Sequence, residues 1–424
     1  MKKFLMILIS RKDKITMKVL MVTPDCFMID RRIILEAKTL INAGYEVTLL
    51  AGFECSEETH YLKDGISIYR YKYDWEDKRL ERISSFLPRS KFLNKCYSRL
   101  IKPFYEMTAF EYFMLEKISQ FEADVYHAHD FPCLKAAVYA ARKRKIPLIY
   151  DAHEIYYSQR MFPDAVQQKY FKEEKKYIKY ADIVITVNQF ISDIMAKQYK
   201  TTPEVIMNCA EMPVNFNPAE SYRLLKNKIK VAADWKIILY QGWLSPERNI
   251  EALIKGVRFL PDKCCLVIIG YGEYEGMLRK IASEEKVQEK IFFLGKISPD
   301  EILHYTAGAD IGVIPYLPID ENHRYCSPNK FFEYILAGIP VITNNSFFFR
   351  AMNEKYGVVH TIDTFSPEKF AQAVTEMLFN KSKFNEMKNN CYKAAKELNW
   401  DVEGKKLLSV YNRLKASINM SDRH

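Results

Sequence analysis

Residues 18–50 of the chain read KVLMVTPDCFMIDRRIILEAKTLINAGYEVTLL. The apolar run that ends at Thr23 is short and uninterrupted, which is typical of a strand buried on both faces. Apolar residues then recur at positions 33, 34, 37, 40 and 41, which is the spacing of a helix with one apolar face. Gly44 ends that helix, and residues 46–50 form a second apolar run. The stretch therefore predicts two parallel strands joined by a helix.

The same alternation continues toward position 205 and predicts a first α/β domain over residues 17–205. Because a parallel sheet buries both of its faces, helices are expected on either side of it. The expected strands are 66–71, 124–128, 147–150 and 182–187, and the expected helices are 105–120, 132–144 and 165–180.

Pro and Asn residues gather between positions 203 and 222, which is typical of a linker, here 206–222. The alternation then restarts and predicts a second α/β domain over residues 223–395. Its expected strands are 236–240, 264–269, 291–294, 310–314 and 339–343, and its expected helices are 247–259, 274–285, 299–307, 328–337 and 367–379.

Both ends of the chain fall outside these two domains. Residues 1–16 hold a short apolar run followed by Arg11 and Lys12, without a small-residue cleavage site, so they are interpreted as an N-terminal extension rather than a signal peptide. Residues 396–424 contain a long amphipathic helix near 402–417. Such a helix is expected to pack on one of the two domains.

The composition limits the class of protein. With 424 residues, 48% apolar and 27% charged, the chain is not an intrinsically disordered one. The nine cysteines are scattered, are odd in number and form no Cys-x-x-Cys pair, which disfavours a disulfide framework or a cysteine zinc site. Reduced thiols in a cytosolic protein are expected instead.

The formal charge of +10 is not spread evenly along the chain. Residues 78–102 hold eight Lys and Arg against one acid, and the basic residues alternate with apolar ones. The patch that includes Arg89, Lys91, Lys95 and Arg99 favours an anionic membrane surface. The alternative is a solvated helical excursion. Stacking aromatic residues are not interleaved with a long basic groove pattern, so nucleic acid is not an expected partner.

The sharpest local motif is SPNKFFEY, residues 327–334. Ser327 is expected to cap a helix that has Pro328 at its first position. The free N–H groups of that helix, together with Lys330, suit a phosphate or diphosphate. Glu333 lies on nearly the same face and suits a ribose diol. The alternative is an ordinary capped helix with a Lys–Glu pair on its surface.

A second motif, YQGWLSPERN, covers residues 240–249 and follows the first strand of the second domain. Ligands of open α/β sheets bind at the carboxyl ends of strands. Arg248 is placed there, at a helix start, where its guanidinium can bind phosphate oxygens. A solvated Arg is the alternative.

Histidines follow two strands of the first domain. His127 and His129 point to the same side of a strand, but two ligands are too few for a metal, and no metal site is predicted. His153 follows the strand at 147–150 and is placed to donate a hydrogen bond to a sugar or to stabilise developing charge. The alternative is a histidine whose partners are neighbouring backbone groups.

An ordered series of segments resembles the GT-B glycosyltransferases of family 4, also called glycosyl transferases group 1. The segments are residues 30–50, HAHD, YDAHE, YQGWLSPERNIEALI, FFLGKIS, ADIGVIPY and SPNKFFEYILAGIPVI. The resemblance implies two Rossmann-like domains facing a cleft, with a C-terminal helix that crosses back to the first domain.

The resemblance also implies roles for particular residues. His153 would contact the transferred sugar, Glu333 the ribose, and Arg248 and Lys330 the diphosphate. Further contacts implied are Asn329 and Phe331 for the diphosphate, Gly242 and Gly272 in the donor loops, and Gly295, Lys296 and Ile297 for the base. Two positions depart from the family pattern: Tyr325 stands where a first glutamate is expected, and Trp243 stands where many members have Arg. The acidic pair Asp320–Glu321 could replace that glutamate only if its loop folds back.

The implied activity is that of a retaining, metal-independent glycosyltransferase with a UDP- or GDP-type sugar donor and no further cofactor. The acceptor would be a glycan or a lipid-linked molecule in surface polysaccharide or glycolipid assembly. The expected location is the cytoplasm, with peripheral binding at the inner face of the membrane. The alternatives are a catalytically silent GT-B partner subunit and another nucleotide-sugar enzyme such as an epimerase.

Overall fold

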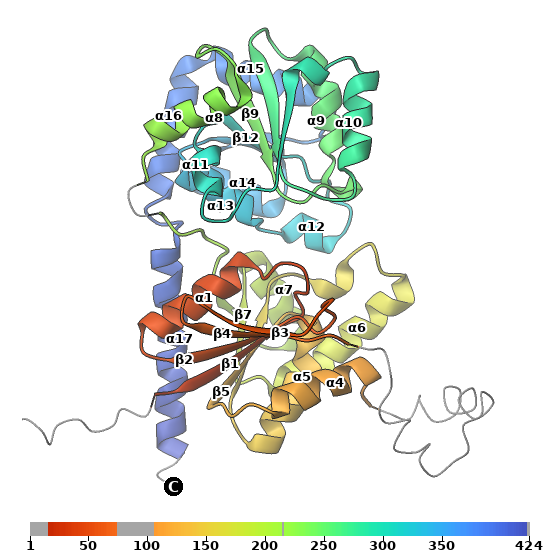
Figure 1. Ribbon diagram of the computed structural model, residues 1–424, viewed down its shortest axis with the longest axis vertical. Coiled ribbons are helices and arrows are strands. Elements are labelled where there is room, and N and C mark those ends of the chain that lie inside the picture. Colours follow the sequence, from red (N-terminus) through yellow and green to blue (C-terminus); the bar gives the residue numbers. More distant parts are fainter. Residues whose placement is uncertain (1–15, 74–105, 214–215, 422–424) are drawn as a thin grey trace, which may run out of the picture.

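The computed structural model describes residues 16–73, 106–213 and 216–421. Within these ranges the chain forms two α/β domains, the second above the first in Figure 1, with an eight-stranded and a six-stranded sheet. Both domains have the alternating strands and helices that the sequence predicts. The predicted α/β class with two Rossmann-like domains is therefore confirmed.

The first sheet has the strand order β3-β4-β2-β1-β5-β6-β7-β8, and only β3 runs antiparallel to its neighbour. Its strands are β1 (Lys18–Thr23), β2 (Glu46–Ala51), β3 (Thr59–Lys63), β4 (Ile66–Arg70), β5 (Val125–His129), β6 (Leu148–Ala152), β7 (Ile183–Thr186) and β8 (Glu204–Val205). The central strands are buried along their whole length, as expected for a sheet covered on both faces.

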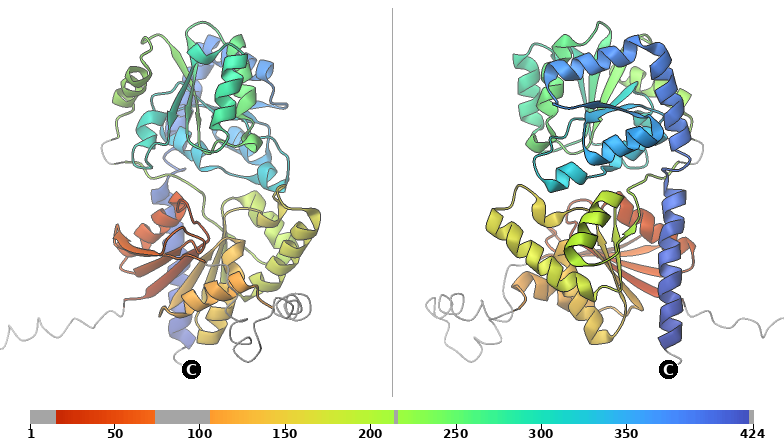
Figure 2. Two further views of the ribbon diagram at one scale, coloured as in Figure 1. Left: turned by 45° about the vertical axis from the view of Figure 1, so that its right-hand side comes forward. Right: turned by 180° about the vertical axis from the view of Figure 1, so that it is seen from behind.

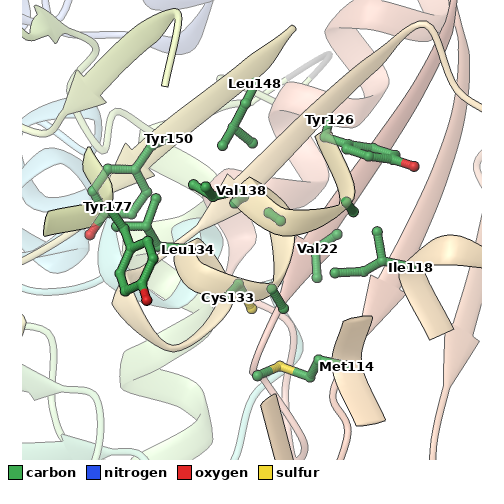
Figure 3. Packing of buried hydrophobic residues seen from close by; sticks show 14 of the residues in the cluster. Val22, Met114, Ile118, Tyr126, Cys133, Leu134, Val138, Leu148, Tyr150 and Tyr177 are labelled. Carbon is green, nitrogen blue, oxygen red and sulfur yellow. The ribbon is translucent and has the colours of Figure 1, made fainter. Parts of the chain in front are cut away.

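Helices cover both faces of the first sheet. One face carries α4 (Ala109–Ser119), α5 (Phe131–Arg144), α6 (Asp164–Tyr177) and α7 (Gln189–Tyr199). Figure 3 shows α5 packed there, with Leu134 and Val138 beside Leu148 and Tyr150 of β6. The other face carries α1 (Arg31–Asn42) and the last helix, α17 (Trp400–Ser421).

The second sheet is entirely parallel, with the order β11-β10-β9-β12-β13-β14. Its strands are β9 (Lys236–Gln241), β10 (Cys264–Ile269), β11 (Ile291–Gly295), β12 (Ile311–Ile314), β13 (Val341–Asn344) and β14 (Val359–Ile362). This is the strand order 3-2-1-4-5-6 of the Rossmann fold. The strands β4-β2-β1-β5-β6-β7 of the first domain have the same order.

The helices of the second domain form two layers around its sheet. One layer contains α8 (Pro218–Ile229), α11 (Ile302–Thr306), α13 (Asn329–Leu336) and α14 (Phe347–Tyr356). The other contains α9 (Ile250–Gly256), α10 (Glu275–Glu284) and α15 (Pro367–Phe379). Two further helices are α12 (Glu321–Tyr325), which faces the first domain in Figure 1, and α16 (Lys381–Ala394).

The last helix leaves the second domain and packs along the first, as both views of Figure 2 show. Leu407, Val410 and Tyr411 are buried in the core between α1 and the first sheet. The indole Nε1 of Trp400 donates a hydrogen bond of 2.8 Å to Thr39 Oγ1. The predicted crossing helix is thus present and completes the core of the first domain.

The structure differs from the sequence predictions in several elements, among them α7, α14, α16 and β14, which were not predicted. The β3–β4 hairpin was not predicted, because every residue of β3 is exposed and no apolar alternation marks it. The helix predicted at 247–259 is broken, because Asn249 has a φ of 54° between a 3₁₀ turn, Pro246–Arg248, and α9. The helix α8 begins at Pro218, inside the predicted linker. Among the described residues, no helix is long and apolar enough to cross a membrane.

Candidate active site

The carboxyl ends of both sheets meet between the two domains. Helix α12 lies at this boundary, where Asn322 contacts the first domain. The Asn322 side chain donates to Glu154 Oε2 at 2.8 Å and accepts from the backbone N–H of Ile155 at 3.3 Å. The backbone N–H of Arg160 donates to Asp320 Oδ2 at 2.9 Å. Ligands of open α/β sheets bind at such strand ends, so the candidate site lies here.

Two buried cations stand at the second-domain side of this boundary. The Lys330 ammonium lies 4.2 Å from the ring centroid of Tyr240, and the Arg248 guanidinium lies 4.4 Å from that of Tyr316. Within the described chain, neither Lys330 Nζ nor Arg248 Nε has a hydrogen-bond partner. Burial lowers the pKa of Lys330. Among the described residues neither cation forms a close ion pair, and a buried cation without one is costly, so the geometry favours an anionic ligand beside them.

Glycine lets the backbone approach these cations. A Cβ on Gly242, whose φ is 129°, would lie 2.7 Å from Lys330 Nζ. The turn at Gly272, with a φ of 158°, is packed even more closely, because a Cβ there would lie 2.2 Å from the carbonyl oxygen of Leu244. The predicted donor-loop glycines are therefore required by backbone geometry, and Gly242 keeps the space beside Lys330 open.

The start of α13 differs from the prediction in two respects. Pro328 is the cap residue and Ser327 does not cap the helix; instead Asn188 of the first domain donates to Ser327 Oγ at 3.2 Å. Asn329 remains in the first turn, beside a small cavity between the domains. Phe331 is a correction: its side chain is fully buried in the core, and its N–H is bonded to the carbonyl of Pro328. It offers no group to a diphosphate.

Glu333 is held from both domains. Its Oε1 accepts a 2.9 Å bond from Arg31 of the first domain, and its Oε2 accepts from the side chain of Gln241. Gln241 is in turn fixed by Thr306, whose hydroxyl donates to Gln241 Oε1 at 2.8 Å. Glu333 and Asn329 line the small cavity at this point. A ribose diol bound here would share the carboxylate with Arg31.

His153 is surrounded by carboxylates at the first-domain side of the boundary. Its Nδ1 lies 3.6 Å from Asp130 Oδ2 and its Nε2 lies 3.5 Å from Asp151 Oδ2. Burial alone lowers the pKa of His153, but Asp130 and then Asp151 outweigh it and raise the pKa to about 10. The ring therefore carries a positive charge at neutral pH and can donate to an oxygen that gains negative charge.

Asp130 is a site residue that the sequence prediction missed. It has a φ of 61° and a ψ of 160°, a region that is almost exclusive to glycine. Its Oδ1 accepts a 3.0 Å bond from the backbone N–H of His153. Burial raises the pKa of Asp130 to about 7, against the attraction of His153. Its place at the end of HAHD, directly after β5, was the only signal in the sequence. Non-glycine residues in this region cluster at active sites.

The predicted base-binding residues lie at the end of β11, the edge strand of the second sheet: Gly295 is its last residue, and Lys296 and Ile297 follow it. The Lys296 ammonium lies 4.8 Å from the ring centroid of Tyr271. Gly295 has a φ of 70°, and the space that a Cβ would occupy there is open, while Ile297 packs partly buried against the core. The three residues are therefore consecutive at the carboxyl end of an edge strand, two strands away from β9.

The two departures from the family pattern have structural explanations. The Tyr325 ring stacks on Phe347 at 5.0 Å between centroids, and Trp243 is 43% exposed. Asp320 and Glu321 do not replace the missing carboxylate, because Asp320 caps α12 and bonds His323 while Glu321 contacts Tyr157. The predicted membrane patch, Arg89, Lys91, Lys95 and Arg99, lies outside the described residues.

Two family models match the chain in succession. Residues 29–210 match the model "Glycosyltransferase Family 4", and residues 222–398 match "Glycosyl transferases group 1". Together these two matches cover both α/β domains of the chain. The chain belongs to the family 4 glycosyltransferases of the GT-B class.

Relatives and solved structures agree with this assignment. The chain is 24% identical over 288 residues to the alpha-monoglucosyldiacylglycerol synthase of Streptococcus pneumoniae, covering 64% of this chain and 63% of that protein. It is 30% identical over 146 residues to a GDP-mannose-dependent phosphatidylinositol monomannoside mannosyltransferase of Mycobacterium tuberculosis, covering 33% of this chain and 37% of that protein. HepE of Anabaena, solved with UDP and glucose, superposes with a TM-score of 0.72 at 13% identity, covering 93% of this chain and 99% of HepE.

Proposed function

We propose that the chain is a retaining glycosyltransferase that moves a sugar from a UDP- or GDP-type donor to a glycan or a lipid-linked acceptor. The observation that carries the proposal is the pair of buried cations, Arg248 and Lys330, which have unpartnered nitrogen atoms beside the Gly242 turn. A diphosphate is the anion that this position in the GT-B fold suits. The solved complex of HepE with UDP and glucose supports a nucleotide-sugar donor.

In the proposed reaction the leaving diphosphate is stabilised by side chains. As the bond between the sugar C1 and the phosphate oxygen breaks, negative charge grows on that oxygen. Arg248 and Lys330 counter this charge in a site with little water, where fixed charges act strongly. The proposed reaction is metal-independent in the sense that no metal ion is needed at the diphosphate.

The anomeric configuration of the sugar is retained if the acceptor attacks C1 on the same face from which the diphosphate leaves. The acceptor oxygen forms the new bond to C1, and its proton passes to the departing phosphate oxygen, so no protein nucleophile is required. His153, positively charged between Asp130 and Asp151, would donate a hydrogen bond to the transferred sugar. Closure of the two domains would exclude water from the activated sugar.

The acceptor is proposed to be at a membrane surface. The names of the two relatives contain a monoglucosyldiacylglycerol and a phosphatidylinositol monomannoside, which supports a glycolipid or another lipid-linked acceptor over a free sugar. The basic segment 78–102 would bind anionic lipid from the cytoplasmic side. In liposome flotation the wild-type chain should bind anionic vesicles, whereas a variant with Arg89, Lys91, Lys95 and Arg99 replaced by Gln should not. Equal flotation of both would contradict peripheral binding through this segment.

The donor is tested by a panel of UDP-, GDP- and dTDP-sugars, with thermal shift for binding and product analysis for transfer. One nucleotide class should raise the melting temperature and support transfer to a lipid extract with an α-linked product. A product with inverted configuration would contradict the retaining mechanism. Conversion of the donor sugar without any acceptor would instead indicate an epimerase.

A second candidate, a catalytically silent partner subunit, is favoured by Tyr325. Its ring stacks on Phe347 and its carbonyl accepts a 2.8 Å bond from Asn188, so the position that a catalytic carboxylate would occupy serves packing. Hydrolysis or transfer by the wild type in the nucleotide-sugar panel separates the two candidates, and Glu333→Ala should abolish that turnover. Glu376→Ala, at an exposed carboxylate of the same domain, is the matched control. Full turnover of Glu333→Ala would show that the site is misplaced.

A further inference from the structure

A second histidine lies directly behind His153, on the side that faces the interior of the first domain. His129, the last residue of β5, is completely buried, and its Nδ1 lies 3.2 Å from His153 Nε2. The two rings meet edge to face, with 5.3 Å between their centroids. His129 also stands opposite Asp151 in the sheet register, so its backbone is fixed by the central strands of the sheet. In the reaction proposed above, His129 has no part.

The direction of the hydrogen bond between the two rings follows from their charges. Burial lowers the pKa of His153, but Asp130 and Asp151 raise it to about 10, so both of its ring nitrogens carry a proton at neutral pH. Burial lowers the pKa of His129 well below its ordinary value, so that ring is neutral and carries one proton. His153 Nε2 is therefore the donor, and His129 Nδ1 is the acceptor.

The surroundings of His129 suit the tautomer that can accept this bond. Because Nδ1 accepts, the proton of His129 is on Nε2. That nitrogen lies 3.9 Å from Glu36 Oε2, which is too long for a direct hydrogen bond, but a carboxylate oxygen favours an N–H over a lone pair there. Arg32 donates to the other oxygen of Glu36 at 2.8 Å and to both oxygens of Asp151 at 2.7 and 2.9 Å. The carboxylates around His129 are therefore held in place before a substrate binds.

The bond to His129 leaves one N–H of His153 for a ligand. His153 Nε2 donates to His129 and lies 3.5 Å from Asp151 Oδ2. His153 Nδ1 lies 3.6 Å from Asp130 Oδ2 and 3.9 Å from Asp30 Oδ2, and both distances are too long for good hydrogen bonds. The ring is thus anchored in the sheet through Nε2, and Nδ1–H is the group that can donate to a sugar oxygen.

We propose that His129 is a positioning residue: its Nδ1 accepts the Nε2 proton of His153 and thereby aims the Nδ1–H of His153 at the transferred sugar. The inference rests on the proposed function, in which His153 donates to that sugar. Without the acceptor, His153 would keep its charge, because Asp130 and Asp151 remain beside it. It would lose the fixed direction of its free N–H, and a donor that is not fixed stabilises developing charge less well.

The hydrogen bond itself is tested by NMR of the full wild-type chain with isotope-labelled histidine nitrogen atoms. At neutral pH both ring nitrogens of His153 should be protonated, and His129 should be protonated at Nε2 alone. A coupling across the hydrogen bond should join His153 Nε2 to His129 Nδ1. The variants His153→Ala and His129→Leu assign these signals, and each should remove the coupling. A proton on His129 Nδ1, or a neutral His153, would overturn the proposal.

Two variants of nearly equal shape test the effect on turnover. In His129→Asn an amide oxygen bonded to Cγ can take the place of Nδ1, whereas His129→Leu has a methyl group there. In His129→Leu, kcat should fall by about 10-fold because the donor is misdirected, whereas in His129→Asn it should stay within about three-fold of the wild type. The affinity for the free nucleotide, measured by calorimetry, should change less than two-fold in both.

The outcomes separate the positioning role from the proposed function. Equal losses of kcat in the two folded variants, or full turnover of His129→Leu, would overturn the positioning role while the transferase activity stands. Absence of transfer by the wild type, with the coupling present in its NMR spectrum, would contradict the proposed function and leave the hydrogen bond established, because the spectrum needs neither donor nor acceptor.

Discussion

The two domains share a strand order but treat charge differently at the edges where they meet. At the first-domain edge, two buried cations are paired with carboxylates of the same domain: His153 is set between Asp130 and Asp151, and Arg32 is paired with Glu36 and Asp151. At the second-domain edge, Arg248 and Lys330 carry buried nitrogen atoms without partners. The same fold therefore has one edge where buried cations form ion pairs and one where they form none within the described residues.

The difference indicates how work is divided between the domains. An edge with matched charges holds its side chains in place before any substrate arrives, which suits positioning of a sugar and an acceptor. An edge with unmatched cations gains most of its stabilisation when an anion binds, which suits a nucleotide diphosphate. Substitutions at the second-domain edge should weaken nucleotide binding, whereas those at the first-domain edge should affect turnover.

The largest effect is expected at the unmatched edge. Lys330→Ala removes one buried cation, and a charged hydrogen bond of about 1.5–3 kcal/mol corresponds to about 10–150-fold. We expect kcat/KM for the nucleotide sugar to fall by about 100-fold, measured by steady-state transfer. The control Lys255→Ala removes a partly exposed cation of the same domain and should change kcat/KM for the nucleotide sugar less than two-fold. Unchanged nucleotide affinity in Lys330→Ala would contradict the assignment of nucleotide binding to the second-domain edge.

The next effect is expected at the matched edge. His153→Ala should lower kcat by about 10–100-fold, because a positioned charged donor to the sugar is lost. The affinity for the free nucleotide, measured by calorimetry, should change less than two-fold. A large loss of nucleotide affinity would show that the two edges are not separate in function. His323→Ala, in which a histidine of α12 bonded to Asp320 is removed, controls for the loss of an imidazole near the domain boundary.

A smaller effect concerns backbone strain at Asp130. Its backbone conformation costs a non-glycine residue about 1–3 kcal/mol. Asp130→Ala keeps that cost, whereas Asp130→Gly removes it, and both lose the side-chain bond to His153. The glycine variant should therefore be more stable than the alanine variant by about 1–2 kcal/mol in urea unfolding, while both lose turnover. Equal stabilities of the two variants would show that the site is not strained.

The smallest effect is a pH dependence of stability in the first domain. Glu174 is buried and accepts 2.7 Å bonds from the hydroxyls of Tyr150 and Tyr199. Burial raises its pKa above the ordinary value near 4.5. The folded chain then binds a proton on Glu174 more tightly than the unfolded chain does. The stability that this proton gives is complete below the pKa of the unfolded chain and is lost as pH rises through the pKa of the folded chain. Glu174→Gln should therefore become more stable relative to the wild type as pH increases, as measured by thermal unfolding at several pH values. A difference in melting temperature that does not change with pH would contradict this prediction.

Local patterns predicted most of the elements but not α7, α14, α16 or β14. They did not predict the long-range pairs. The apolar runs at 18–23 and 264–269 became β1 and β10 because a buried parallel strand needs only an uninterrupted apolar sequence. The ion pair of Arg31 with Glu333 joins residues 302 positions apart, and no spacing rule relates them. The same reason hid Glu36 and Asp151, which join His127 and His129 only through the fold.

The capping prediction failed for a related reason. Ser327 has the side chain of a good helix cap, but its hydroxyl bonds Asn188 of the other domain. The hydrogen bond between Ser327 and Asn188 across the domain boundary takes the place of the expected local cap, and only the folded structure shows this pairing. Asp130 was missed because its signal is a backbone conformation rather than a residue type.

The long crossing helix has a consequence for how the chain is made. Leu407, Val410, Tyr411 and Leu414 complete the core between α1 and the first sheet, yet a ribosome adds them after the whole second domain. A nascent chain that has just finished β8 therefore exposes the apolar face of its sheet on which these residues will rest. The second domain can fold as it emerges, whereas the first must keep that face open until synthesis passes Leu414. We expect chaperones that hold apolar surface to bind the first domain during this interval.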